Sequence, residues 1–196
     1  MDNLWHLFQA GGFMMAPILL CSLAAAAIGA ERFLLYRERL GNLPRLTAAA
    51  ETLCGTALEE ALRGDRSSAA AVLREAALRG PASAKERRLE AAAAREEAAL
   101  RERLSWLSAI VTLAPLLGLL GTVMGMMQSF RILSAGSAPF AVTGGVAEAL
   151  VCTAFGLFTA VLALVLHAFL TERLERILFQ IEQVCDLCLA AGAERP

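Results

Sequence analysis

The most constraining feature of this sequence is the stretch 104–130, LSWLSAIVTLAPLLGLLGTVMGMMQSF, which carries no charged side chain over 27 residues. About 20 apolar residues are enough for a helix to cross the hydrocarbon core of a bilayer, so this stretch predicts a transmembrane helix. Small and polar residues recur along it at steps of three or four, which places them on one helical face. They are Ser105, Ser108, Thr112, Pro115, Gly118, Thr122, Gly125 and Ser129. A face of this kind lets helices approach closely, so we expect it to contact protein, a pore or both.

Two further stretches are long enough to span a bilayer, namely 12–30 and 142–171. With 57% apolar residues and a mean hydropathy of +0.56, the chain is predicted to be an all-α, polytopic membrane protein with three transmembrane helices. The segment before the first stretch has no Lys or Arg, so we expect a retained helix there rather than a cleaved signal peptide.

The basic residues predict the orientation. Of the 18 Lys and Arg residues, 14 lie between positions 32 and 103. Because positive charge is enriched in cytoplasmic loops, the N-terminus is expected outside and the C-terminus in the cytoplasm. The expected segments are an outer amphipathic piece (1–11), transmembrane helix 1 (12–36), a cytoplasmic helical region (37–103), transmembrane helix 2 (104–130), an outer loop (131–141), transmembrane helix 3 (142–171) and a cytoplasmic C-terminal helix (172–196).

The cytoplasmic region is rich in Ala, Glu and Arg, which favour helices. Turn signals at Gly41-Asn42, Gly64-Asp65 and Gly80-Pro81 divide it into helices over roughly 44–63 and 66–79 and a third that begins at Ser83. No breaking residue follows before Pro115, so we expect this third helix to continue unbroken into transmembrane helix 2. The short polar segment 134–139 predicts that helices 2 and 3 are antiparallel neighbours.

Glu148 is the only acid within the three apolar stretches 12–30, 104–130 and 142–171. An intramembrane carboxylate is energetically costly and usually marks an ion pathway, a proton relay or a buried partner. Its carboxylate could instead stabilise the positive N-terminal end of its own helix, or pair with Arg131 near the outer interface. Thr122 and Thr153 are hydroxyls at membrane depth, and the alternative for each is a local bond to a backbone carbonyl one turn back.

No catalytic or metal-binding constellation is evident. Cys185 and Cys188 have C-x-x-C spacing, but no second pair or histidine follows, and they are expected to be small apolar residues on a helix. We read His6 and His167 as interfacial residues. We predict no enzyme activity, no cofactor and no nucleic-acid partner.

The segments TLAPLLGLLGTVMGMMQSF (112–130) and GGVAEALVCTAFGL (144–157) together resemble the MotA/TolQ/ExbB proton-channel family, most closely its ExbB and TolQ branch. The stretch 11–40 is similar to the first span of that branch. The resemblance implies a homo-oligomeric ring, expected to be a pentamer, in the inner membrane of a Gram-negative bacterium, so that the outer segments are periplasmic. The central pore of this ring encloses the single transmembrane helices of a dimeric ExbD/TolR-like partner, and a TonB/TolA-like protein is associated with the assembly. Such an assembly uses the proton gradient to drive work on the outer membrane.

By that resemblance, Thr122, Glu148 and Thr153 match the pore-lining polar residues of the family, whose proton acceptor is an aspartate of the partner. Helix packing is assigned to Pro115, Gly118, Gly121, Gly125 and Gly156. Gly144-Gly145 replaces a proline that the family often has before this segment. The expected function is the channel wall of an ExbB-type motor for TonB-dependent transport. The alternatives are a TolQ-like role in envelope integrity and constriction, or a structural scaffold in which Glu148 only locks helices together.

Overall fold

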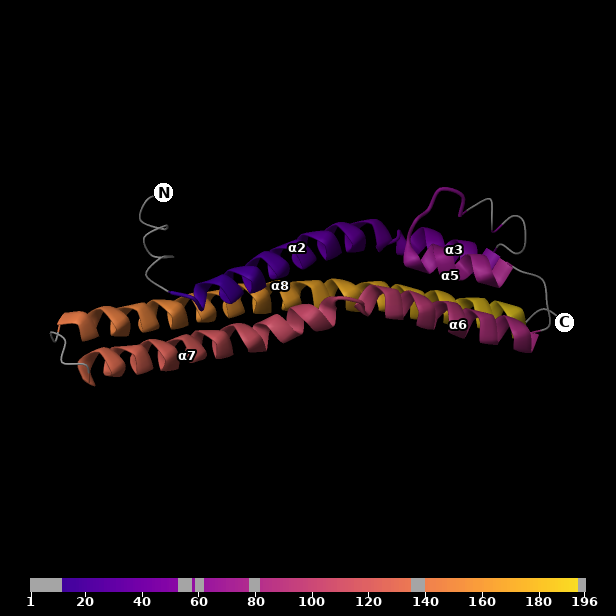
Figure 1. Cartoon of the computed structure of the whole chain (residues 1–196). Helices are drawn as coiled ribbons and strands as arrows, with labels where there is room; N and C mark the ends of the chain where they lie inside the picture. Colours follow the sequence, from indigo (N-terminus) through magenta and orange to yellow (C-terminus); the bar gives the residue numbers. More distant parts are fainter. Residues whose placement is uncertain (1–11, 53–57, 59–61, 78–81, 135–139, 194–196) are drawn as a thin grey trace. The chain divides into compact units, whose positions relative to one another are not determined.

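The computed structural model describes residues 12–52, 58, 62–77, 82–134 and 140–193. All regular structure in these residues is helical, as the sequence predicts: α2 (Met15–Arg39), α3 (Leu43–Thr52), α5 (Ser68–Ala77), α6 (Ala82–Arg101), α7 (Leu104–Ser134) and α8 (Phe140–Ala193) (Figure 1). Three helical stretches are long and apolar enough to cross a membrane, namely Met15–Arg39, Ser83–Ser134 and Thr143–Ala190. The expected three spans therefore correspond to helices of sufficient length.

The helix expected to run unbroken from Ser83 is interrupted, so this prediction is wrong at one point. Helix α6 ends at Arg101 and α7 begins at Leu104, with Arg103 in the left-handed region at φ 66°. The last carbonyls of α6 are satisfied by side chains of α2: Arg32 Nη1 donates to the carbonyl of Ala99 (3.0 Å) and the Tyr36 hydroxyl to that of Leu100 (2.7 Å). These bonds take the place of the backbone partners that a helix end lacks.

The chain forms two compact units. The described part of unit 1 contains the first half of α2, all of α7 and the first half of α8. Helices α7 and α8 lie side by side and antiparallel, because Gly118 approaches the backbone of Thr153 and Gly125 approaches Ala149 (Figure 1). The predicted antiparallel arrangement is confirmed, and the turn at 135–139 lies outside the described residues. Helix α2 packs on α8 in parallel, with Gly29 against the Leu166 side chain.

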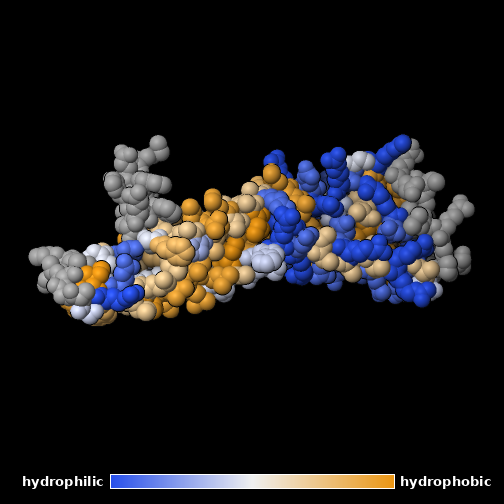
Figure 2. Space-filling model, in the orientation of Figure 1, coloured by the Kyte–Doolittle hydropathy of each residue, from blue (hydrophilic) through white to orange (hydrophobic). Residues whose placement is uncertain are grey.

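Unit 2 contains the rest of α2 and α8 with α3, α5 and α6. On α8 the buried residues of this unit recur at helical spacing: they include Leu174, Ile177, Ile181, Val184 and Cys188. Helix α6 contacts this part of α8, where Lys85 Nζ donates to the carbonyl of Cys188 (3.1 Å). In Figure 2 the visible face of unit 1 is mostly hydrophobic, whereas charged residues cover much of unit 2. This difference fits a unit in lipid and a unit in water.

The predicted breaks are found where the structure describes them. No helix covers 40–42, and Gly64 adopts φ 87° in the turn before α5. The break at Gly80-Pro81 lies outside the described residues. So do residues 53–57 and 59–61 of the helix predicted over 44–63, of which α3 covers the first part. Helix α5 begins after Ser67, whose hydroxyl accepts a bond from the backbone N–H of Ala70 (3.3 Å), which is an N-cap. Asp65 holds the cap residue by accepting from its N–H (2.9 Å).

Two adjacent serines provide a matched test of this cap. Ser67→Ala is expected to lower the free energy of unfolding by about 1 kcal/mol, because it leaves a helical N–H without an acceptor. Ser68→Ala should be neutral or slightly stabilising, since the buried Ser68 hydroxyl has no hydrogen-bond partner. Chemical unfolding of the detergent-purified protein, followed by far-UV circular dichroism, measures both. An equal loss of unfolding free energy in the two variants would contradict the assignment of Ser67 as the N-cap.

Candidate functional site

Unit 1 is held together by a seam of small residues between α7 and α8. A Cβ added at Gly156 would lie 2.7 Å from the carbonyl oxygen of Ala114 and 3.0 Å from Gly118 Cα. A Cβ at Gly118 would lie 3.1 Å from Thr153 Cα, and one at Gly125 would lie 2.9 Å from Ala149 Cβ. A Cβ at Gly121 would overlap the Cys152 side chain. The two backbones are therefore as close as glycine permits, as in small-residue helix pairs of membrane proteins.

The stripe predicted on α7 coincides with this seam only in its second half. Gly118 and Ser129 are buried and Gly125 is half-buried, whereas Ser105, Ser108 and Thr112 are exposed. In the first half of α7, the buried positions are instead the bulkier Leu107, Ile110 and Ala114. Pro115 is half-buried within the helix. Because proline lacks an N–H, the carbonyl four residues before it has no partner in the helical ladder.

The two candidate threonines act on the same turn of α7. The Thr153 hydroxyl donates across the seam to the carbonyl of Gly118 (2.9 Å). The Thr122 hydroxyl donates to the carbonyl of Leu119 (2.7 Å), which is the local bond considered as its alternative. Both side chains are half-buried. Thr153 thus joins α7 to α8, while Thr122 makes a bond within its own helix, and both hydroxyl oxygens still have acceptor capacity.

Glu148 lies on a different side of α8, next to the start of α2. A Cβ added at Gly12 would overlap the Glu148 Oε1 atom, and Gly12 itself adopts φ 62°. The Glu148 side chain is half-buried and forms no hydrogen bond or ion pair with another described residue, Arg131 included. Glycine allows the close approach because it has no side chain and tolerates a positive φ. No local signal in the sequence links Gly12 to a carboxylate 136 positions later.

The structure therefore separates the three polar candidates into two threonines, Thr122 on α7 and Thr153 on α8, that bond to the same turn of α7, and an acid beside α2. Their separation of five positions places Glu148 and Thr153 about 140° apart around the helix, at ~100° per residue. The two side chains cannot both face one narrow target, but both can face a wider cavity that is shared between helices.

The described residues contain no group of three or more His, Cys, Asp and Glu that could hold a metal ion. In the C-x-x-C pair Cys188 is buried and Cys185 half-buried. Burial, with smaller contributions from Cys188 and Asp186, raises the pKa of the Cys185 thiol to about 11. Burial also raises the pKa of Cys188. Both sulfurs are protonated at neutral pH, unlike metal ligands or redox nucleophiles.

This pKa predicts slow alkylation. At pH 8 the Cys185 side chain is a thiolate in about one protein molecule in a thousand, against about one in ten for an unperturbed thiol. Labelling of a variant with only Cys185 by iodoacetamide should be about a hundredfold slower in the folded protein than in denaturant, and should accelerate as the pH rises toward 11. Peptide mass spectrometry over time measures this. Equal rates in the two states would contradict the assignment.

Comparison with known proteins supports a single family. The model of the MotA/TolQ/ExbB proton channel family matches residues 60–183, which is more than half of the chain. An ExbB-like biopolymer transport protein of Synechocystis is 52% identical over 59 residues, which are 28% of this chain and 28% of that protein. The TolQ protein of the Tol-Pal system of Haemophilus influenzae is 38% identical over 77 residues, 38% of this chain and 34% of TolQ.

An ExbB homologue of Methanothermobacter thermautotrophicus is 36% identical over 81 residues, 41% of this chain and 29% of that protein. The chain thus spans about a third or less of the length of these curated relatives.

Proposed function

Because the chain belongs to the MotA/TolQ/ExbB proton channel family, we propose that it forms the channel wall of an ExbB-type, proton-driven motor. Its three apolar helices and its ExbB and TolQ relatives identify a multi-pass inner-membrane protein. In the proposal, five copies surround the single transmembrane helices of a dimeric ExbD/TolR-like partner. The motor transmits force through a TonB-like protein to outer-membrane transport, with the N-terminus periplasmic and the C-terminus cytoplasmic.

One observation carries the proposal: Glu148 is a half-buried acid to which the described residues give no hydrogen bond or ion pair. A structural carboxylate at membrane depth is expected to be paired, because an unpaired one is costly in lipid. An acid that the described residues leave unpaired is instead available to exchange protons or to act on a charge carried by another chain. This argument favours a motor over a structural scaffold.

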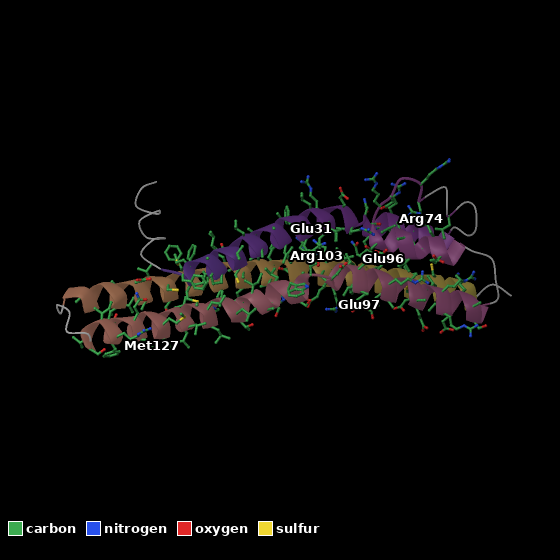
Figure 3. The ribbon with its side chains drawn as sticks, in the orientation of Figure 1. Glu31, Arg74, Glu96, Glu97, Arg103 and Met127 are labelled. Atoms are coloured by element: carbon green, nitrogen blue, oxygen red, sulfur yellow. The ribbon has the colours of Figure 1, made fainter. Side chains whose placement is uncertain are left out.

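The outer surface of α7 supports assembly with further helices. Large apolar side chains are exposed along it, among them Leu116, Leu120, Met124, Met127 and Phe130. Figure 3 labels Met127 on this helix. Since the seam with α8 already occupies the glycine face, these side chains remain for lipid, for neighbouring copies or for a partner helix.

The proton gradient provides enough free energy for the mechanical work that the motor is proposed to do. One proton moved through 100 mV yields about 2.3 kcal/mol, so a few protons supply work comparable to breaking a protein interface. In the proposal, the aspartate of the partner accepts the proton, while Thr122, Glu148 and Thr153 provide polar groups along the wall of a central pore.

Proton flux tests the proposal. Liposomes that contain this chain with its copurified single-span partner should acidify internally when a gradient is imposed, as reported by an enclosed pH-sensitive dye. Liposomes with this chain alone should not acidify, because the acceptor is missing. Flux at the level of empty liposomes in the complete complex would favour the scaffold alternative.

A TolQ-like role in envelope integrity is the second candidate, favoured by the similarity to TolQ of Haemophilus influenzae. The two roles differ in their companions. Affinity purification of the chain from its own cells, followed by mass spectrometry, should recover a TonB-like protein for the first role and a TolA-like protein for the second.

A further inference from the structure

Helices α2 and α8 both change from apolar to charged sequence within unit 2. After 14 uncharged residues at 17–30, α2 reaches Glu31, and α8 reaches Glu172 after the uncharged stretch 149–171. Beside these transitions the Phe33 and Phe169 rings lie 6.0 Å apart, and both are about 40% exposed. Exposed aromatic residues next to arginines are typical of the boundary between lipid and water.

A pocket opens at this level between the two helices. It has a volume of about 220 Å³ and is lined by Phe33, Tyr36, Arg37, Leu170 and Arg173. The lining contains two arginines and no carboxylate. One part of the pocket is apolar and the other is positively charged, which is the pattern of an amphiphilic anion.

The two guanidinium groups are available to a ligand. Arg37 is exposed and makes no hydrogen bond or ion pair with another described residue. The Arg173 guanidinium lies over the Phe169 ring, 5.3 Å from its centroid, and makes no ion pair within the described residues. The ring holds Arg173 in place without neutralising its charge. The nearest acid along α8, Glu172, is paired with Arg176 instead.

We propose that this pocket binds the phosphate headgroup of an anionic phospholipid, in the leaflet on the side of the C-terminus. The phosphodiester lies between Arg37 and Arg173, and the acyl chains lie along the apolar lining residues Phe33 and Leu170. Guanidinium groups suit phosphate because they donate two parallel hydrogen bonds. Basic pockets between transmembrane helices bind such headgroups in other membrane proteins. This inference rests on the membrane location and is independent of the proton motor.

Native mass spectrometry of the detergent-purified protein tests the proposal. Dioleoyl phosphatidylglycerol is added stepwise, and dioleoyl phosphatidylcholine is the zwitterionic comparison. Wild type should bind phosphatidylglycerol preferentially. Arg37→Gln and Arg173→Gln should each weaken that binding about fivefold, and the double variant about twenty-fivefold, if each arginine contributes the ~1 kcal/mol typical of a basic residue at an anionic membrane surface.

Arg176→Gln is the matched control, because it removes the same charge from the same helix outside the pocket. It should retain wild-type affinity for phosphatidylglycerol. Inorganic phosphate in millimolar excess should not displace the lipid, since phosphate lacks the acyl contacts. Far-UV circular dichroism establishes that each variant is folded.

Three results would overturn the proposal. The first is equal binding of the two lipids by wild type. The second is a loss in Arg176→Gln as large as that in Arg173→Gln. The third is displacement of the lipid by inorganic phosphate, which would identify a site for a free anion.

Discussion

Gly156→Ala is expected to destabilise unit 1 by about 2–3 kcal/mol, the upper part of the range for overpacking a tight contact. The added methyl group would lie 2.7 Å from the Ala114 carbonyl oxygen and 3.0 Å from Gly118 Cα. Both obstacles are backbone atoms, so no rotamer change can relieve the overlap. The helices must separate, which also lengthens the bond from Thr153 to the Gly118 carbonyl.

Gly144→Ala is the matched control on the same helix. A Cβ at Gly144 meets no atom within 4 Å, so the variant should be as stable as wild type or slightly more stable, because alanine favours helix. Titration of the purified protein with sodium dodecyl sulfate, followed by circular dichroism, measures the loss of structure. Equal unfolding midpoints for Gly156→Ala and wild type would show that the seam is not the main contact of unit 1.

Glu148→Gln is expected to abolish gradient-dependent work while leaving assembly intact. Glutamine keeps the shape of the side chain but cannot titrate. The side chain has no hydrogen-bond partner among the described residues that the substitution would disturb. We expect activity to fall by at least about a hundredfold, the lower end of the contribution of a positioned proton-transfer group, so that no gradient-dependent work is detected. Substrate uptake or envelope integrity in cells measures the activity, and blue native electrophoresis measures the assembled complex.

Two companion variants separate a protonic from a structural role. Glu148→Ala removes both shape and charge, and by the proposal it should also assemble normally and lose activity. Glu172→Gln removes an exposed acid from the same helix outside unit 1, and activity should be retained. If the role is structural, Glu148→Gln should be active and Glu148→Ala should fail to assemble. Full activity of a normally assembled Glu148→Gln complex would end the proposed role of this residue.

The transmembrane helices and their pairing were predictable because the physics behind them is local. A run of uncharged residues such as 104–130 is costly to expose to water whatever surrounds it, so it indicates a span by length alone. Gly118, Gly125 and Ser129 fall on one face because helical geometry repeats every 3.6 residues. The short segment between α7 and α8 leaves two consecutive helices few arrangements other than antiparallel.

Only the tertiary structure determined where α6 ends, which threonine joins two helices and where Glu148 points. Nothing near Arg103 in the sequence breaks a helix; the carbonyls of Ala99 and Leu100 are bound by side chains more than 60 positions earlier. Thr122 and Thr153 have the same chemistry, yet one hydroxyl stays within its helix and the other crosses the seam. Such choices depend on which backbone lies within ~3 Å of a side chain, and that is decided by packing between distant segments.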